Sequence, residues 1–209
     1  MTTIGKKKLI CAGIACLVSF FITGGVMRER QLEEKIEETQ EGLAEEVFRF
    51  HVLANSNSEA DQSLKLEVRD AVLSYMKKSL PEDTTKEETK AWAEENLETL
   101  ELVAEAEMRN HGYGYQAEAQ VGIVDFPEKT YGDITFPAGD YEALQIVLGE
   151  GKGNNWWCVL YPNLCFIDSV YAVVPEEGKE EMENVLTEEE YEMVTMGTKF
   201  KIKWFFFGE

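Results

Sequence analysis

An uncharged apolar run near the start of the chain constrains its fold and location most. Residues 9–27 read LICAGIACLVSFFITGGVM, and Lys6, Lys7 and Lys8 precede them. A run of this length can span a bilayer as a helix, and basic residues ahead of an apolar middle are also typical of a secretory signal. The match to a cleavage site is weak, so the sequence favours an uncleaved anchor over a cleaved signal. In either case the lysines should stay in the cytoplasm and the following residues should cross the membrane.

Three segments follow from this reading. Residues 1–27 are the membrane anchor or signal, residues 28–46 a charged tether, and residues 47–209 an extracytoplasmic domain. Three of the 20 basic residues lie in residues 1–27 but none of the 40 acidic ones, which leaves 17 against 40, a net charge of −23. Such a surface repels phosphate, so we expect no nucleic acid partner. The acidity serves either solubility or a partner rich in Lys and Arg.

Residues 47–54, VFRFHVLA, alternate in the way typical of a β-strand. Ser58 precedes Asp61 by three residues and is a plausible cap for a following helix. The two faces of the strand would carry Phe48, Phe50, Val52 and Ala54 on one side and Arg49, His51 and Leu53 on the other.

The rest of the chain separates helices from strands. Apolar residues at helical spacing predict helices over about 59–79 and 85–110. Alternation predicts a half-buried strand over 113–126, more strands after it, a short helix that begins near Thr187, and a last strand over 199–207. This order predicts an α+β fold: a largely antiparallel sheet with two long amphipathic helices packed on one face, preceded by the N-terminal transmembrane or signal segment.

Residues 149–168, GEGKGNNWWCVLYPNLCFID, combine glycines, tryptophans and cysteines. If residues 160–163 form a four-residue hairpin loop, Cys158 lies opposite Cys165 at a distance that suits a disulfide. The alternative is two reduced, buried cysteines. The glycines lead into a strand rather than a helix, which favours a flexible connector over a phosphate-binding loop.

Trp156 and Trp157 are adjacent in this strand, so their rings should leave on opposite faces. One can enter the core, and the other can contact a protein or a sugar unless both are covered. The chain has only two histidines, His51 and His111, and no hydrolase motif surrounds either of them. We therefore expect no catalytic residues, no cofactor and no metal, and the pattern favours a binding or signalling module over an enzyme.

Two long segments carry a family resemblance. FRFHVLANSNSEADQSLKLEVRDAVL (48–73) and FPAGDYEALQIVLGEGKGNNWWCVLYPNLCFID (136–168) resemble the signature regions of stage II sporulation protein R of endospore-forming Firmicutes. The resemblance implies a protein that is made in the forespore and exported toward the mother cell. There it would trigger a membrane-embedded aspartic-type protease, which cleaves the inactive precursor of sigma E. The chain would be the signal, anchored in the forespore membrane or secreted into the intermembrane space, and not the protease.

Chemistry alone suggests a partner-binding surface for this signal. It combines the predicted hairpin with the loop after the first strand. The candidate residues are Trp156, Trp157, Tyr161, Pro162 and Asn163 in the hairpin and His51, Asn55, Asn57 and Ser58 in the loop region.

Two other functions stay open at this point. One is a cell-envelope glycan-binding module or a peptidoglycan hydrolase, with a tryptophan as sugar platform and His51 as acid–base. The other is an inert structural membrane protein.

Overall fold

The computed structural model describes residues 3–81, 84–166, 174, 176–196 and 203, without the side chains of residues 3–12, 14, 15 and 177. The chain divides into two units, residues 1–39 with 198–209 and residues 40–197. The predicted anchor and tether form one continuous helix, α1 (Thr3–Glu46). Part of the predicted anchor thus has no described side chains. Across the described residues, no helix combines the length and apolar character that crossing a membrane requires.

The second unit is built on a four-stranded sheet with the order β2-β5-β1-β6. β5 runs parallel to β1, whereas the β2–β5 and β1–β6 pairs are antiparallel. The fold is α+β as predicted, but the sheet is mixed rather than largely antiparallel. Parallel neighbours need a long crossover, and the helices between β1 and β2 supply it. The strands are β1 (Phe48–Leu53), β2 (Ala117–Phe126), β5 (Gly139–Leu148) and β6 (Asn155–Tyr161).

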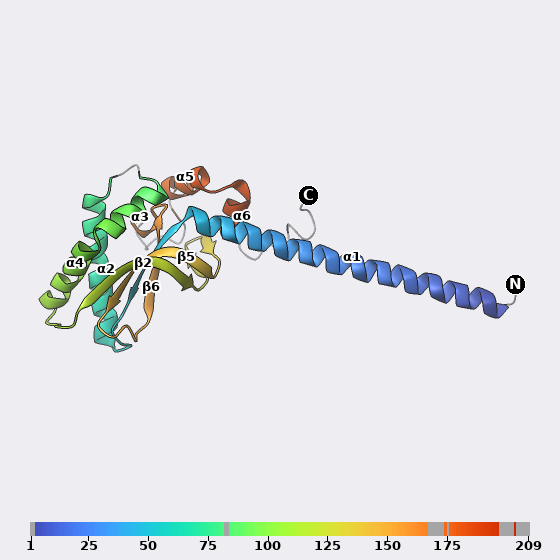
Figure 1. The fold of residues 1–209 in the computed structure, drawn as a ribbon, viewed down its shortest axis with the longest axis horizontal. Coiled ribbons are helices and arrows are strands. Elements are labelled where there is room, and N and C mark those ends of the chain that lie inside the picture. Colours follow the sequence, from blue (N-terminus) through green and yellow to red (C-terminus); the bar gives the residue numbers. More distant parts are fainter. Residues whose placement is uncertain (1–2, 82–83, 167–173, 175, 197–202, 204–209) are drawn as a thin grey trace. The chain divides into compact units, whose positions relative to one another are not determined.

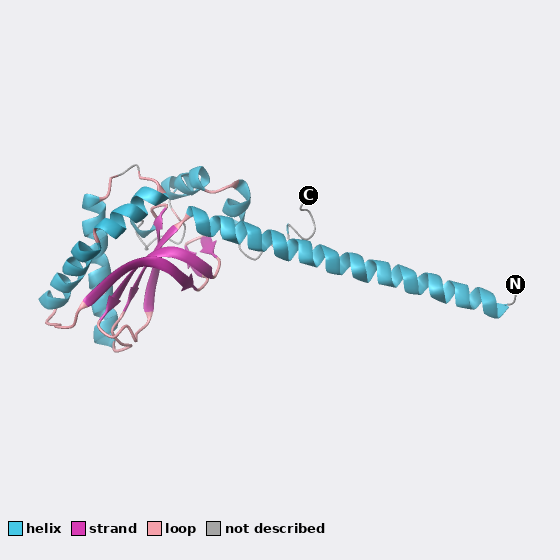
Figure 2. Ribbon diagram, viewed as in Figure 1, coloured by secondary structure: helices cyan, strands magenta, loops and turns pink. Residues whose placement is uncertain are grey.

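Three helices pack on one face of this sheet (Figures 1 and 2). They are α2 (Glu59–Ser79), α3 (Lys86–Glu95) and α4 (Leu97–Asn110). The Ser58 cap is confirmed, because its side chain accepts a hydrogen bond from the Asp61 N–H. The predicted helix over 85–110 divides at Asn96, whose backbone leaves the helical conformation and whose side chain donates to the Trp92 carbonyl over 2.8 Å.

The core lies between these helices and the sheet. β1 contributes Phe48, Phe50 and Val52 to it, as the alternation predicted. The helices contribute a row of apolar residues at helical spacing. The fully or almost fully buried members from the helices are Leu64, Val68, Val72, Met76, Ala93, Leu100, Ala104 and Met108.

Smaller elements complete the second unit. A two-stranded ribbon consists of β3 (Lys129–Tyr131) and β4 (Ile134–Phe136), and α6 (Glu188–Met196) packs against β4. α5 (Glu176–Val185) precedes α6, which begins beside Thr187 as predicted. The predicted strand over 199–207 lies outside the described residues except for Lys203.

Candidate functional site

Arg49 and His51 lie on the sheet face opposite α2, α3 and α4. Strand alternation sends them there while their neighbours enter the core. Both side chains are buried, with Arg49 0% and His51 2% exposed. The sequence predicted that the two residues share a face but not that this face is covered. Burial of two basic side chains is costly unless their surroundings compensate, so their surroundings define the candidate site.

The Arg49 guanidinium lies among aromatic rings. Its central carbon is 4.1 Å from the ring centre of Phe126, 4.8 Å from that of Tyr141 and 5.5 Å from that of Phe136. Nη2 donates to the Tyr131 hydroxyl over 3.0 Å. Burial lowers the pKa of Arg49, and the two tyrosines partly offset this effect. Cation–π contacts therefore stabilise this charge in a place where no water-like solvation is available.

His51 stacks on Trp157, with ring centres 4.8 Å apart and an angle of 2° between the planes. The ring centre of Phe126 lies 5.4 Å from that of His51, and the two ring planes are tilted by 60° to each other. The pKa of His51 is lowered to about 4, mainly by burial and to a lesser extent by the charge of Arg49, with the neighbouring Asn155 partly offsetting both. His51 is therefore neutral at physiological pH and lacks the second ring proton that a histidine donates as a general acid.

Next to these buried groups the same face is partly accessible. We define the open face as a set of half-buried or exposed side chains that strand register places on one side of the sheet. The open face consists of Leu53, Glu118, Gln120, Val124, Gln145, Val147, Asn155 and Trp157.

The open face adjoins a concentration of unsatisfied polar atoms. In the described part of the chain, every buried side-chain nitrogen or oxygen without a hydrogen-bond partner belongs to Arg49, His51 or Asn155. Such atoms are rare in folded proteins, and each one costs free energy. These atoms are themselves enclosed, so a partner on the open face would contact the half-buried Asn155 and Trp157 rather than the side-chain nitrogens of Arg49 and His51.

The two tryptophans divide between the faces, as predicted. Trp157 belongs to the open face, whereas Trp156 packs edge-on against Phe50 on the helix side, with ring centres 5.6 Å apart. Arg69 of α2 lies 5.0 Å above the Trp156 ring. The structure therefore separates two residues that the sequence analysis assigned to one surface.

Two loops meet beside the open face: the first loop (54–58) and the second loop (149–154). The side-chain oxygens of Asn55 and Asn57 accept hydrogen bonds from backbone N–H groups of the second loop over 2.9 and 2.7 Å. These asparagines, predicted to bind a partner, already serve to hold the two loops together.

Asp61 in the first turn of α2 organises the first loop. Its carboxylate accepts hydrogen bonds from Asn55 Nδ2 over 3.0 Å, Ser56 Oγ over 2.5 Å and Tyr115 OH over 2.9 Å. Its own N–H donates to Ser58 Oγ over 3.1 Å. These hydrogen bonds, above all the one from Ser56, lower the pKa of Asp61. The sequence analysis treated Asp61 only as a helix-cap residue and missed this role.

The glycines of the second loop permit its close approach to the first. The Gly153 N–H donates to the Ala54 carbonyl over 2.8 Å. A Cβ atom at Gly153 would overlap the carbonyl group of Ser56. The glycine-rich stretch is therefore a close-packed contact rather than a flexible connector.

Gly153→Ala should lower the free energy of unfolding by about 2–3 kcal/mol, because one loop must move away from the other. The matched control is Gly122→Ala, since nothing lies within 4 Å of a Cβ built at Gly122. Denaturant unfolding of both variants measures the difference. Equal stability of the two variants would show that the loops do not pack as described.

The other predicted residues lie at the far end of β6. Tyr161 is paired with Phe48 at the opposite end of β1 from the first loop. Pro162 is buried, and the Asn163 N–H donates to Glu181 of α5 over 3.3 Å. The structure therefore does not bring these three residues together with the first loop.

The predicted hairpin after Trp157 is wrong, because β6 pairs with β1 and the chain continues into a short 3-10 helix, η1 (Leu164–Phe166). The predicted disulfide is nevertheless present. Cys158 and Cys165 are joined, with their Cα atoms 5.6 Å apart. The bridge ties the end of β6 to η1 instead of linking two opposed strands.

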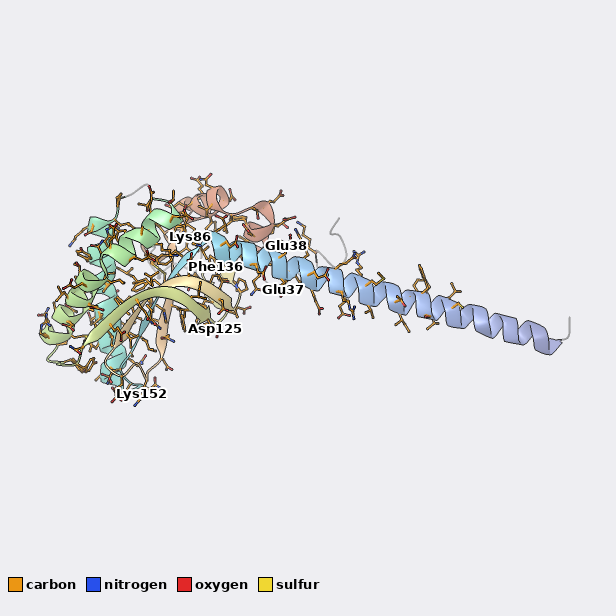
Figure 3. All side chains as sticks on the ribbon, viewed as in Figure 1. Glu37, Glu38, Lys86, Asp125, Phe136 and Lys152 are labelled. Atoms are coloured by element: carbon orange, nitrogen blue, oxygen red, sulfur yellow. A yellow bond between two sulfur atoms is a disulfide. The ribbon has the colours of Figure 1, made fainter. Side chains whose placement is uncertain are left out.

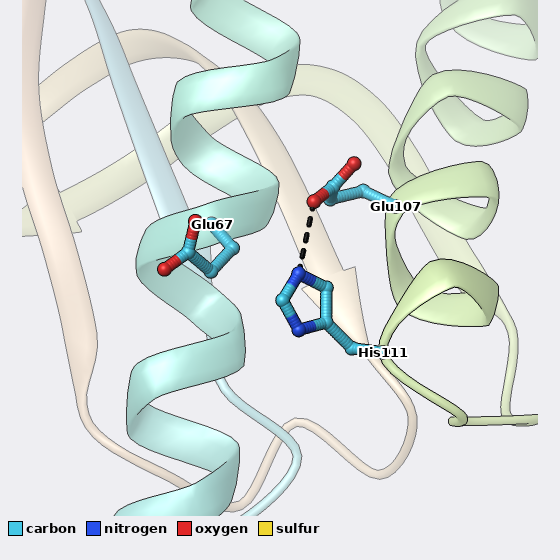
Figure 4. Close-up of side chains that lie close together, drawn as sticks. All are labelled: Glu67, Glu107 and His111. Atoms are coloured by element: carbon cyan, nitrogen blue, oxygen red, sulfur yellow. Dashed lines mark hydrogen bonds and ion pairs between the residues drawn. The ribbon is translucent and has the colours of Figure 1, made fainter.

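One group among the described residues could hold a metal ion: Glu67 of α2 with Glu107 and His111 at the end of α4 (Figure 4). His111 Nε2 and Glu107 Oε1 lie 3.0 Å apart. Glu67 and His111 are exposed, and this helical pairing accounts for the arrangement without an ion.

Comparison with known proteins decides the family. The family model for stage II sporulation protein R matches residues 44–171, a range that contains the sheet, the three packed helices and the candidate site. The chain belongs to the stage II sporulation protein R family. Stage II sporulation protein R of Bacillus subtilis (strain 168) is 35% identical over 191 residues, which cover 91% of this chain and 84% of the relative. No solved structure matches the chain. Membership in the stage II sporulation protein R family supports a role in stage II of sporulation.

Proposed function

We propose that this member of the stage II sporulation protein R family is an exported signal that activates a membrane-embedded protease across the intermembrane space. The forespore makes it, and residues 9–27 carry it to or across the forespore membrane. It remains anchored there or is released. The partner is the aspartic-type protease of the opposite membrane that cleaves the precursor of sigma E.

The observation that carries this proposal is the open face, whose half-buried side chains include Trp157 beside the enclosed His51. A signalling protein needs a rigid surface that a partner protein can reach. The sheet supplies the rigidity, and the half-buried Trp157 supplies an aromatic side chain of the type that dominates binding energy at protein interfaces.

The same geometry weakens the hydrolase alternative. A hydrolase would need His51 to exchange protons with a substrate near neutral pH. The ring is instead packed against both Trp157 and Phe126, whose own ring centres lie 4.6 Å apart. With a pKa of about 4 it stays neutral, which suits a packed aromatic support for Trp157.

Activation by binding has an energetic requirement. A partner shifts a two-state enzyme only by binding its active state more tightly than its inactive state. Moving the protease from almost entirely inactive to almost entirely active takes about 5.5 kcal/mol of differential affinity. A few well-placed contacts on the open face, each worth about 2 kcal/mol, are enough.

The test is deletion of the gene in a sporulating host, followed by immunoblotting of the sigma E precursor. We expect the precursor to stay uncut in the deletion strain and the full chain to restore cleavage. A chain that lacks residues 1–27 should fail to restore it, because it stays on the cytoplasmic side. Normal cleavage in the deletion strain, or rescue by the shortened chain, would contradict the proposal.

A biochemical control distinguishes the signalling function from the glycan-binding or peptidoglycan-hydrolase alternative. The purified full chain is incubated with peptidoglycan, and both sedimentation with the polymer and release of soluble fragments are measured. The signalling function predicts neither effect.

A further inference from the structure

The outer edge of β2 is a long and regular strand edge. β2 is the first strand in the sheet order, so among the residues that the structure describes only β5 pairs with it. Its register with β5 continues from Ala117 to Phe126 without a shift. A regular edge of this length presents a row of backbone donors and acceptors that can template another strand.

One side-chain contact shows which backbone groups point outward. The Ala119 N–H donates to Glu101 Oε1 of α4 over 2.9 Å, so it does not face β5. Backbone direction alternates along a strand. The N–H and C=O groups of Val121, Ile123 and Asp125 therefore also point away from β5. Within the described part of the chain, no backbone group pairs with them.

This part of the edge lacks the features that protect natural edge strands. Bulges, prolines and lysines usually prevent unwanted pairing, and residues 118–126 contain none of them. Ile123 is instead 66% exposed. Nothing lies within 4 Å of a Cβ atom built at Gly122, so the backbone is approachable.

The negative charge around this edge indicates which kind of polypeptide segment can bind to it. Glu118 and Asp125 are exposed on β2, and Asp125 is labelled near the end of the strand in Figure 3. Glu101 adds a third carboxylate beside Ala119. A second copy of the chain would bring the same carboxylates together, which costs free energy, whereas a basic chain would gain it.

We propose that the outer edge of β2 binds an extended basic segment of a partner protein as a fifth strand. Backbone hydrogen bonds at Val121, Ile123 and Asp125 supply the pairing, and the apolar side chain of Ile123 and the flanking carboxylates select the segment. This edge belongs to β2, whereas Trp157 of the open face lies on β6, and the test below does not depend on the proposed function.

The experiment measures hydrogen exchange of backbone amides by NMR in the isotope-labelled full chain in detergent. The probe is a short synthetic peptide of alternating lysine and valine. At a peptide concentration about nine times its Kd, exchange at Val121, Ile123 and Asp125 should slow about tenfold. Amides of β2 that already face β5 should not change.

Three controls make the test specific to strand addition. The same peptide with alternate amides N-methylated keeps its charge and apolar side chains but cannot pair, and it should give no protection. The variant Ile123→Pro removes an outward N–H without removing a hydrogen bond to β5, so it should abolish protection. Leu102→Thr removes an exposed apolar residue from α4 and should leave protection intact.

Three results would overturn the proposal. The first is equal protection by the methylated and unmethylated peptides, or protection by neither. The second is concentration-dependent protection without peptide, which would identify a second copy of the chain as the occupant. The third is protection without peptide at every dilution, which would show that the chain itself already covers this edge.

Discussion

Asp61→Ala should lower the free energy of unfolding by about 3 kcal/mol, because a hydrogen bond to a charged group contributes about 1.5–3 kcal/mol and Asp61 accepts several. Asp61 is 7% exposed and accepts hydrogen bonds from the side chains of Asn55, Ser56 and Tyr115. Without the carboxylate these donors lose their acceptor, and Asn55 loses the contact that orients its oxygen toward the second loop. Denaturant unfolding of the full chain measures the effect.

Glu59→Ala is the matched control, because Glu59 is also acidic and lies in the same first turn of α2. Both residues interact favourably with the helix dipole, which is worth up to about 1 kcal/mol at the surface. Glu59 is exposed, so its replacement should cost no more than that. If the two variants lose the same stability, Asp61 acts only through the dipole and does not organise the loops.

Lowering the pH from 7 to 4 should destabilise the wild-type chain by about 3 kcal/mol more than the variant His51→Leu. The pKa of His51 is lowered to about 4 in the folded chain from 6.5. Above pH 6.5 the ring is neutral in both folded and unfolded chains. Below it the unfolded chain binds a proton that the folded chain resists, so stability is lost as the pH falls from 6.5 toward 4.

The measurement is a series of denaturant curves for both proteins across this pH range. Carboxylates such as Asp61 also lose stabilising interactions in acid, but they do so equally in the two proteins, and the difference isolates His51. Parallel curves for wild type and variant would show that solvent reaches the ring, and the buried environment assigned to the stacked His51 would be wrong.

Local sequence patterns predicted the elements that depend on neighbouring residues. Alternation in residues 47–54 assigned both faces of β1 correctly, and Ser58 caps α2 as expected. Adjacent positions in a strand were enough to place Trp156 and Trp157 on opposite faces. The cysteine spacing also indicated the disulfide, although the hairpin proposed to form it does not exist.

The sequence could not predict what depends on distant segments. The parallel neighbour of β1 is β5, which follows almost a hundred residues later in the chain. The aromatic surroundings of Arg49 come from Phe126, Phe136 and Tyr141 on three different strands. Nothing in the pattern around Arg49 distinguishes an enclosed arginine from a solvated one. The candidate site is therefore a product of tertiary packing.

The most direct test of the open face compares two adjacent tryptophans in sporulating cells. Trp157→Ala alters the open face, and Trp156→Ala alters the helix side, while both side chains are half-buried. Gln120→Arg adds a bulky charge to the open face at an exposed position, and Leu102→Arg adds the same charge to the outer surface of α4. The amount of exported chain is measured for each variant.

The readout is the fraction of sigma E precursor that is cleaved per exported molecule. We predict that Trp157→Ala and Gln120→Arg lower it about tenfold or more, as expected for loss of a dominant interface contact. Trp156→Ala and Leu102→Arg should leave it near the wild-type value. Equal cleavage by all four variants would show that the partner does not bind the open face.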